Sequence, residues 1–193
     1  EYCVVCRLIL NGTIHSGLSQ GDLIGGPKVM AGILAASLDD NQAFDRDDVL
    51  RRYLVWWESE GFDTGPVANS VFELISNGED PKAAVEAIDK SFNGLTAGCN
   101  PAHRNSVLAD ADFLSFEELA AACLSEAALT HQNILAGEVA AVATRLARVL
   151  LEGSTWEKAV GRSVGDLEWS EQITGAITFW KDTPEDRSGF SPA

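Results

Sequence analysis

A glycine-flanked turn with a single carboxylate is the first place in this chain where chemistry could occur. It reads Gly21-Asp22-Leu23-Ile24-Gly25-Gly26-Pro27-Lys28 and runs directly into an apolar, helix-forming stretch. Pro27 suits a first helical position, and the glycines let the backbone approach a ligand closely, so N–H groups beside Asp22 would suit an anion. A plain tight turn before a core helix needs the same residues, and both interpretations stay open.

Two further polar segments lie where helices are expected to begin or end. Phe62-Asp63-Thr64-Gly65-Pro66 places a carboxylate just ahead of a helix start, where Asp63 could serve a site or where Asp63 or Thr64 could cap the helix. Leu129-Thr130-His131-Gln132-Asn133 lies between two apolar stretches. Its lone histidine could be a functional residue or a satisfied structural one.

A third segment, Gly98-Cys99-Asn100-Pro101-Ala102-His103-Arg104-Asn105, combines small residues, a helix start and an arginine. Backbone N–H groups and a guanidinium both complement anions, so this combination favours a negatively charged or diphosphate ligand. The alternative is that Arg104 pairs with one of the many carboxylates of the chain.

Composition restricts the partners and the compartment. The 193 residues carry a formal net charge of -15 without a visible basic patch, so nucleic acid is not an expected partner. No stretch of about 20 uncharged apolar residues predicts a membrane span, and the first dozen residues lack the features of a signal peptide. Four scattered cysteines favour a reducing, cytoplasmic location, and the lone pair Cys3 and Cys6 is only half of a zinc site.

Helical periodicity recurs along the chain and strand-like alternation is scarce, which predicts an all-α fold. Apolar spacing and capping residues predict helices after Pro27, after Asp45, from Pro66 to Asn77-Gly78, after Asp80-Pro81 and over about residues 116–129. Loops are expected at residues 58–64 and 94–101.

The second half of the chain continues the helical pattern. Ser115 with Glu118, and Ser154 with Glu157, predict two capping boxes. Between them, apolar residues on one side predict a long helix and its buried face: Leu135, Val139, Val142, Leu146 and Val149. Helical spacing persists from Trp169 to Trp180, and residues 181–193 are expected to be a loop.

The order of these segments resembles the ADP-ribosylglycohydrolase family, all-α hydrolases that remove ADP-ribose from modified protein side chains. The resemblance covers about residues 21–153. It lies in residues 30–38, 44–45 and 53–57, in Phe62-Asp63-Thr64-Gly65, in Gly98 to Arg104 and in Leu129-Thr130-His131. It implies a compact multi-helix orthogonal bundle, here a single all-α domain over residues 1–193 or the N-terminal portion of a longer domain.

The resemblance also implies an ADP-ribose cleft with two magnesium ions at its base. Carried over by position, Gly98, Asn100 and Arg104 would lie in the loop that wraps the ribose and diphosphate. His131 would approach the ligand from another side, and Asp63 would lie near the mouth of the cleft.

Departures from the family pattern concern the metal ions. The positions that usually hold a Thr-Asp-Asp-Thr-like metal motif read Gly25-Gly26-Pro27-Lys28, which offer magnesium only carbonyl oxygens. A second, C-terminal Asp-x-Asp-Thr-like motif has no counterpart before Ala193. Asp22 is the remaining nearby carboxylate, expected to act as the general base or as a single metal ligand.

Two functions remain open at this point. The first is hydrolysis of an ADP-ribosyl N- or O-glycosidic bond, in which Asp22 positions the attacking water. The second is a catalytically inactive relative that binds ADP-ribose or another nucleotide, or serves as a protein-interaction module. In a further alternative, a second chain or a missing C-terminal segment completes the cleft, and the apolar face of residues 169–180 is an interface.

Overall fold

The computed structural model describes residues 25–165 and 167–182, and this part of the chain contains helices and no strands. The prediction of an all-α fold is therefore confirmed. Asp22, Cys3, Cys6, the side chain of Trp180 and the tail from residue 183 lie outside the description. None of the described helices is long and apolar enough to cross a membrane.

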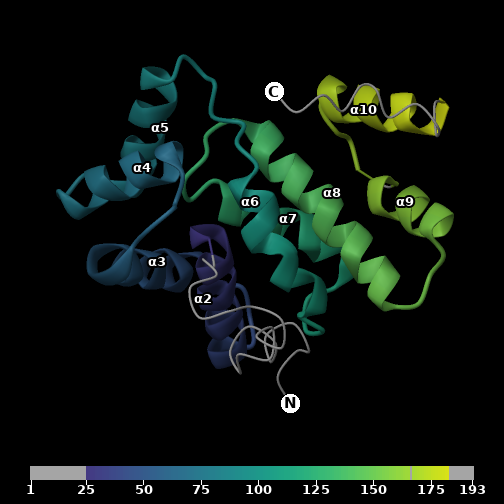
Figure 1. Cartoon of the computed structure of the whole chain (residues 1–193). Coiled ribbons are helices and arrows are strands. Elements are labelled where there is room, and N and C mark those ends of the chain that lie inside the picture. The colour runs from purple at the N-terminus through teal and green to yellow at the C-terminus, as the bar shows by residue number, and fades with distance from the viewer. Residues whose placement is uncertain (1–24, 166, 183–193) are drawn as a thin grey trace.

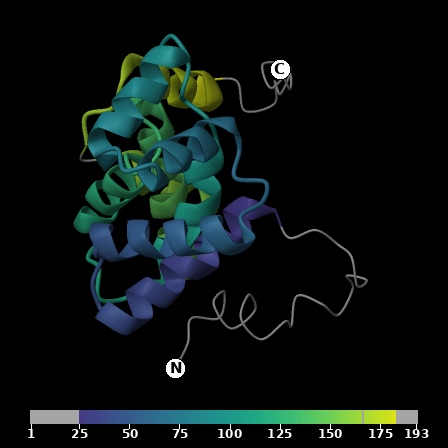
Figure 2. The ribbon, with the colours of Figure 1, turned by 90° about the vertical axis from the view of Figure 1, so that its left-hand side faces the viewer.

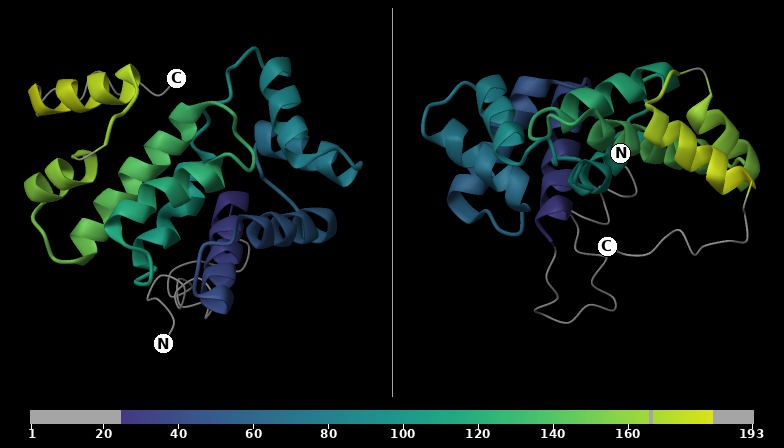
Figure 3. Two further views of the ribbon diagram at one scale, coloured as in Figure 1. Left: turned by 180° about the vertical axis from the view of Figure 1, so that it is seen from behind. Right: turned by 90° about the horizontal axis from the view of Figure 1, so that it is seen from above.

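Two groups of helices flank a central pair, α7 and α8 (Figure 1). Figure 2 looks at the molecule from the side of α3 to α5, and Figure 3 shows α9 and α10 on the far side of α8. The short α6 packs against both α2 and α8. The elements are α2 (Gly26–Asn41), α3 (Arg46–Glu60), α4 (Pro66–Ser76), α5 (Pro81–Ser91), α6 (Asn100–Arg104), the 3₁₀ helix η2 (Asn105–Asp110), α7 (Phe116–Ala127), α8 (Ile134–Leu151), α9 (Trp156–Val164) and α10 (Glu171–Asp182).

Most helix starts follow the capping rules that the sequence indicates. Asp45 accepts hydrogen bonds from the backbone N–H groups of Asp47 and Asp48, and Asp80 accepts one from Ala83. Ser115 forms the expected capping box at the start of α7. Because each cap satisfies N–H groups that have no partner within the helix, local sequence is enough to place these starts.

Two expected caps are wrong. The residue before α4 is Gly65, with φ 77°, and no side chain caps this helix, so neither Asp63 nor Thr64 has that role. Helix α9 begins after Thr155, again without a side-chain cap, and the expected box of Ser154 with Glu157 does not form. The loop expected at residues 58–64 is also shorter than predicted, because α3 continues to Glu60.

The long helix α8 is confirmed, but its buried face differs from the expected one. Val139 is 40% exposed, whereas small residues such as Ala140 and Ala141 are fully buried. A Cβ at Gly137 would lie 2.9 Å from Leu124 Cδ2 and 3.3 Å from Ala127 Cβ. The close approach of α7 and α8 therefore selects small residues at the contact, which a pattern of large apolar side chains cannot reveal.

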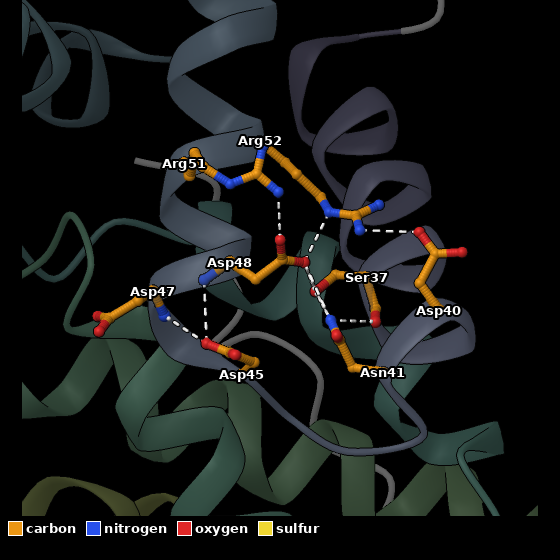
Figure 4. Close-up of polar contacts among 8 residues, drawn as sticks. All are labelled: Ser37, Asp40, Asn41, Asp45, Asp47, Asp48, Arg51 and Arg52. Atoms are coloured by element: carbon orange, nitrogen blue, oxygen red, sulfur yellow. Dashed lines mark hydrogen bonds and ion pairs between the residues drawn. The ribbon is translucent and has the colours of Figure 1, made fainter.

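A cluster of polar side chains joins the end of α2 to the start of α3 (Figure 4). Asp48 Oδ2 accepts hydrogen bonds from Ser37 Oγ at 2.6 Å, Asn41 Nδ2 at 3.0 Å and Arg52 Nε at 2.6 Å. Arg52 also contacts Asp40 at 2.8 Å. The Ser37 hydroxyl foremost, and then the neighbouring arginines, lower the pKa of Asp48 to about 2. This cluster therefore links the last turn of α2 to the first turns of α3.

Candidate functional site

The loop that carries Asp63 packs directly against the start of α2. A Cβ at Gly26 would lie 2.3 Å from the carbonyl oxygen of Phe62 and 2.5 Å from that of Asp63, so only glycine fits at this position. A Cβ at Gly25 would lie 2.9 Å from Asp63 Oδ2. The two glycines thus allow close contact between the helix start and the loop.

The exposed carboxylate of Asp63 lies beside the first turn of α2. Its negative charge is favourable there, because the unpaired N–H groups of a helix start carry partial positive charge. Asp63 also adopts a left-handed backbone conformation, with φ 49°, which is uncommon for a residue other than glycine. A carboxylate that caps no helix and is held in this conformation is a candidate for a functional role.

Asn100 connects this loop to α6. Its Nδ2 donates to the carbonyl oxygen of Thr64 at 2.7 Å, and its Oδ1 accepts from Arg104 Nη1 at 3.2 Å. The side chain of Asn100 therefore holds the end of the Asp63 loop against the segment that begins at Gly98.

Arg104 is completely buried, and its guanidinium contacts protein groups. Nε lies 2.5 Å from Glu126 Oε1, and Nη2 donates to the Glu126 carbonyl oxygen at 3.2 Å and to Thr130 Oγ1 at 2.9 Å. Tyr53 donates to the same Glu126 oxygen at 2.9 Å. Of the two interpretations of Arg104, pairing with a carboxylate is the arrangement observed in this structure.

Sequence reasoning missed Glu126 and Tyr53, although a signal was present. Glu126 follows Leu119 by seven residues and Cys123 by three, which places a carboxylate on the buried face of α7. A buried carboxylate requires a partner of opposite charge, and Arg104 supplies it. Burial, and then the Glu126 carboxylate, raise the pKa of Tyr53, so its hydroxyl remains a donor.

His131 lies at the opposite end of this network, against the loop at Gly98. Its Nδ1 is 2.7 Å from Thr130 Oγ1. A Cβ at Gly98 would lie 3.2 Å from its Nε2. Burial, and then the nearby Arg104, lower the pKa of His131 to about 3, so the ring is neutral under physiological conditions.

The structure therefore brings five of the six expected site residues to one junction: Asp63, Gly98, Asn100, Arg104 and His131. The sixth, Asp22, lies outside the described residues. Two surface depressions lie elsewhere, one between α3 and the α4–α5 pair and one between Phe44 and α7, and neither is lined by these residues.

The described residues do not fit a pair of magnesium ions. Among them, no group of three or more His, Cys, Asp or Glu side chains could hold a metal ion together. At the start of α2, Gly25, Gly26 and Pro27 have no side-chain oxygen, and Lys28 adds a positive charge. Magnesium is held by carboxylates and water, so this donor set is unsuitable for it.

Comparison with known proteins gives one result. The model of a family described as ADP-ribosylglycohydrolase matches residues 28–190. No curated protein and no solved structure matches the chain. The matched segment begins after Asp22 and extends beyond Gly153, so it includes α9 and α10 as well as the junction of Asp63, Asn100 and His131.

Proposed function

The chain belongs to the ADP-ribosylglycohydrolase family, and we propose that it removes ADP-ribose from modified protein side chains or hydrolyses a related N- or O-glycosidic bond. Membership supports a glycohydrolase-like function in general. The observation that carries the specific proposal is the junction itself. An exposed carboxylate on the Asp63 loop is tied through Asn100 to the segment that begins at Gly98, where a neutral imidazole lies against a residue without a side chain.

ADP-ribose offers groups that complement each of these side chains. Its ribose hydroxyls can donate to the Asp63 carboxylate, which accepts hydrogen bonds only. Gly98 is exposed and lets backbone come close to a sugar or diphosphate. His131 approaches the same loop through Nε2.

Asn100 and Arg104 contribute to this site by shaping it. Asn100 ties the Asp63 loop to α6, and Arg104 ties α6 to Glu126 and Thr130. In our proposal the two residues hold the binding loop in place, and the diphosphate is bound by the backbone of the segment that begins at Gly98.

The hydrolytic step needs a carboxylate that positions and deprotonates a water molecule. We assign this role to Asp22, which precedes Gly25 by three residues, and a Cβ at Gly25 would lie 2.9 Å from Asp63 Oδ2. Water attacks the anomeric carbon as the bond to the protein side chain breaks, and the proton taken up by Asp22 is returned through solvent to the departing nitrogen or oxygen of that side chain.

A catalytically inactive relative remains the second candidate. The observation in its favour is the sequence Gly25-Gly26-Pro27-Lys28 at a helix start where carboxylates are expected, together with the positive charge of Lys28. In that case the same junction binds ADP-ribose or an ADP-ribosylated protein without cleaving it.

Release of ADP-ribose from N-linked and O-linked ADP-ribosylated proteins separates these candidates. We expect release by the full chain, loss of release in Asp22→Ala and weaker substrate binding in Asp63→Ala. Asp112→Ala, which changes an exposed carboxylate on another loop, is the matched control. An Asp22→Ala variant as active as the parent would overturn the assignment of the base.

Calorimetry with ADP-ribose, with and without magnesium, completes the test. Binding of ADP-ribose without release of product would favour the inactive relative. Binding that requires magnesium would contradict the inactive relative, because that hypothesis assumes that the metal ions have been lost. A chain that neither binds nor hydrolyses would overturn both proposals.

A further inference from the structure

A series of hydrogen bonds runs from the buried Glu126 carboxylate to His131, whose ring lies against the surface loop at Gly98. Arg104 binds Glu126 through Nε and donates from Nη2 to Thr130 Oγ1 at 2.9 Å. The same hydroxyl oxygen lies 2.7 Å from Nδ1 of His131. The other ring nitrogen, Nε2, faces Gly98 across a gap that a Cβ would close to 3.2 Å.

The direction of the hydrogen bond between Thr130 and His131 follows from Arg104. A guanidinium only donates, so it occupies one lone pair of the Thr130 hydroxyl oxygen and leaves the hydroxyl proton to be donated elsewhere. Among the described residues, Nδ1 of His131 is placed to accept it. A proton on Nδ1 would instead leave the buried hydroxyl proton without an acceptor, which is costly.

We propose that Arg104 and Thr130 are positioning residues that hold His131 as a neutral imidazole with its proton on Nε2, so that His131 donates a hydrogen bond to an oxygen of ADP-ribose at the Gly98 loop. The identity of the ligand rests on the proposed function, but the state of the ring does not. Both Thr130 and His131 are buried, at 1% and 4% exposure, so water does not compete for these bonds.

This arrangement gives His131 a role in recognition and not in proton transfer. A neutral imidazole can donate a hydrogen bond from Nε2 to a ligand oxygen and keep its proton. Arg104 itself contacts no ligand in this proposal. Its charge is balanced by Glu126, and its effect on the site passes through the Thr130 hydroxyl.

Nuclear magnetic resonance can determine directly which ring nitrogen carries the proton. Long-range proton–nitrogen correlation spectra of the labelled full chain distinguish the two tautomers. The chain has three histidines, and a His131→Gln spectrum assigns the His131 signals. His103, which is exposed on α6, is the reference within the same spectrum. We expect a single His131 tautomer with Nε2 protonated, and a Thr130 hydroxyl proton that exchanges slowly with water.

Two substitutions at Thr130 test the positioning role. Thr130→Ser keeps the hydroxyl, so we expect the His131 spectrum and ADP-ribose affinity of the parent. Thr130→Val has a similar shape but no hydroxyl, so the His131 signals should move toward the tautomer mixture that exposed His103 shows. Its affinity for ADP-ribose should fall by about 2- to 10-fold, the effect of one net hydrogen bond.

Each result decides one part of the proposal. A proton on Nδ1 in the parent chain, or an unchanged His131 spectrum in Thr130→Val, would overturn it. If Thr130→Val does not fold, the parent and Thr130→Ser spectra still decide the tautomer. A chain that binds no ADP-ribose refutes the proposed function, whereas a correct tautomer whose Nε2–H signal does not respond to bound ADP-ribose refutes only the recognition role.

Discussion

Arg104 Nε lies 2.5 Å from Glu126 Oε1, and both side chains are completely buried. A buried ion pair depends strongly on both partners, because either charge alone is left without compensation in a poorly solvating interior. This pair is also where α6 is attached to α7, so its integrity affects the loop that begins at Gly98.

Glu126→Gln should destabilise the fold by about 3 to 5 kcal/mol, because it leaves the Arg104 charge buried without its counter-ion. Urea unfolding measures the change in free energy. Glu152→Gln, which removes the same charge from the exposed pair with Arg162, should cost less than about 1 kcal/mol. Equal losses in the two variants would contradict the importance of burial at Glu126.

Gly26→Ala should destabilise the contact between α2 and the Asp63 loop. The new methyl group would meet the carbonyl oxygens of Phe62 and Asp63, so we expect a loss of about 1 to 3 kcal/mol and weaker ADP-ribose binding. Gly161→Ala is the matched control, since nothing lies within 4 Å of its added Cβ inside α9. There, alanine should be neutral or stabilising by up to about 1 kcal/mol.

Mild acid should reduce stability through His131. The unfolded chain takes up a proton on this ring near its ordinary pKa of 6.5, whereas the folded chain does so only at about 3. The contribution of the neutral His131 ring to the free energy of unfolding is therefore fully present above pH 6.5 and is lost progressively as the pH falls toward 3.

Between about pH 7 and about pH 5, we expect a loss of about 1 to 2 kcal/mol that is absent in His131→Gln. Unfolding curves at several pH values measure it. His103→Gln, at an exposed histidine, should retain the pH dependence of the parent. A parent and a His131→Gln variant with the same pH profile would show that the ring is not held neutral.

The Asp48 cluster should make the stability of the fold depend on pH in a lower range than His131 does. Its carboxylate contributes stability that is fully present above its ordinary pKa of 3.8 and is lost as the pH falls to about 2. At neutral pH, Asp48→Asn should cost about 1 to 2 kcal/mol, because several donors converge on the charged group. Asp47→Asn, at the exposed neighbour, should change the free energy of unfolding by less.

Cys99 provides a chemical probe of the binding loop. It is exposed beside Gly98, whereas Cys123 is buried, and burial raises the pKa of its thiol to about 12. Alkylation of the native chain should therefore modify Cys99 and spare Cys123, because the thiolate is the reactive form. Saturating ADP-ribose should slow the modification of Cys99, as measured by mass spectrometry of its peptide. Equal rates with and without ligand would argue against binding at this loop.

Local sequence was sufficient wherever a helix start satisfies its own N–H groups. Asp45, Asp80 and Ser115 cap as predicted because their partners lie within three residues along the chain. The same reasoning failed at Asp63, since the carboxylate turns toward the start of α2, which is distant in sequence. A capping pattern cannot show such a competing neighbour.

The sequence by itself determined that the chain is all-α, where most helices begin, and which segments carry polar groups suited to an ADP-ribosylglycohydrolase. These features depend on periodicity and capping, which are local properties. Only the tertiary structure decided how Arg104 is used, that Glu126 is its partner, and which edge of His131 faces Gly98. Those relationships depend on side chains brought together by the packing of α6, α7 and α8, where the exclusion of water makes every unpaired charge or proton costly.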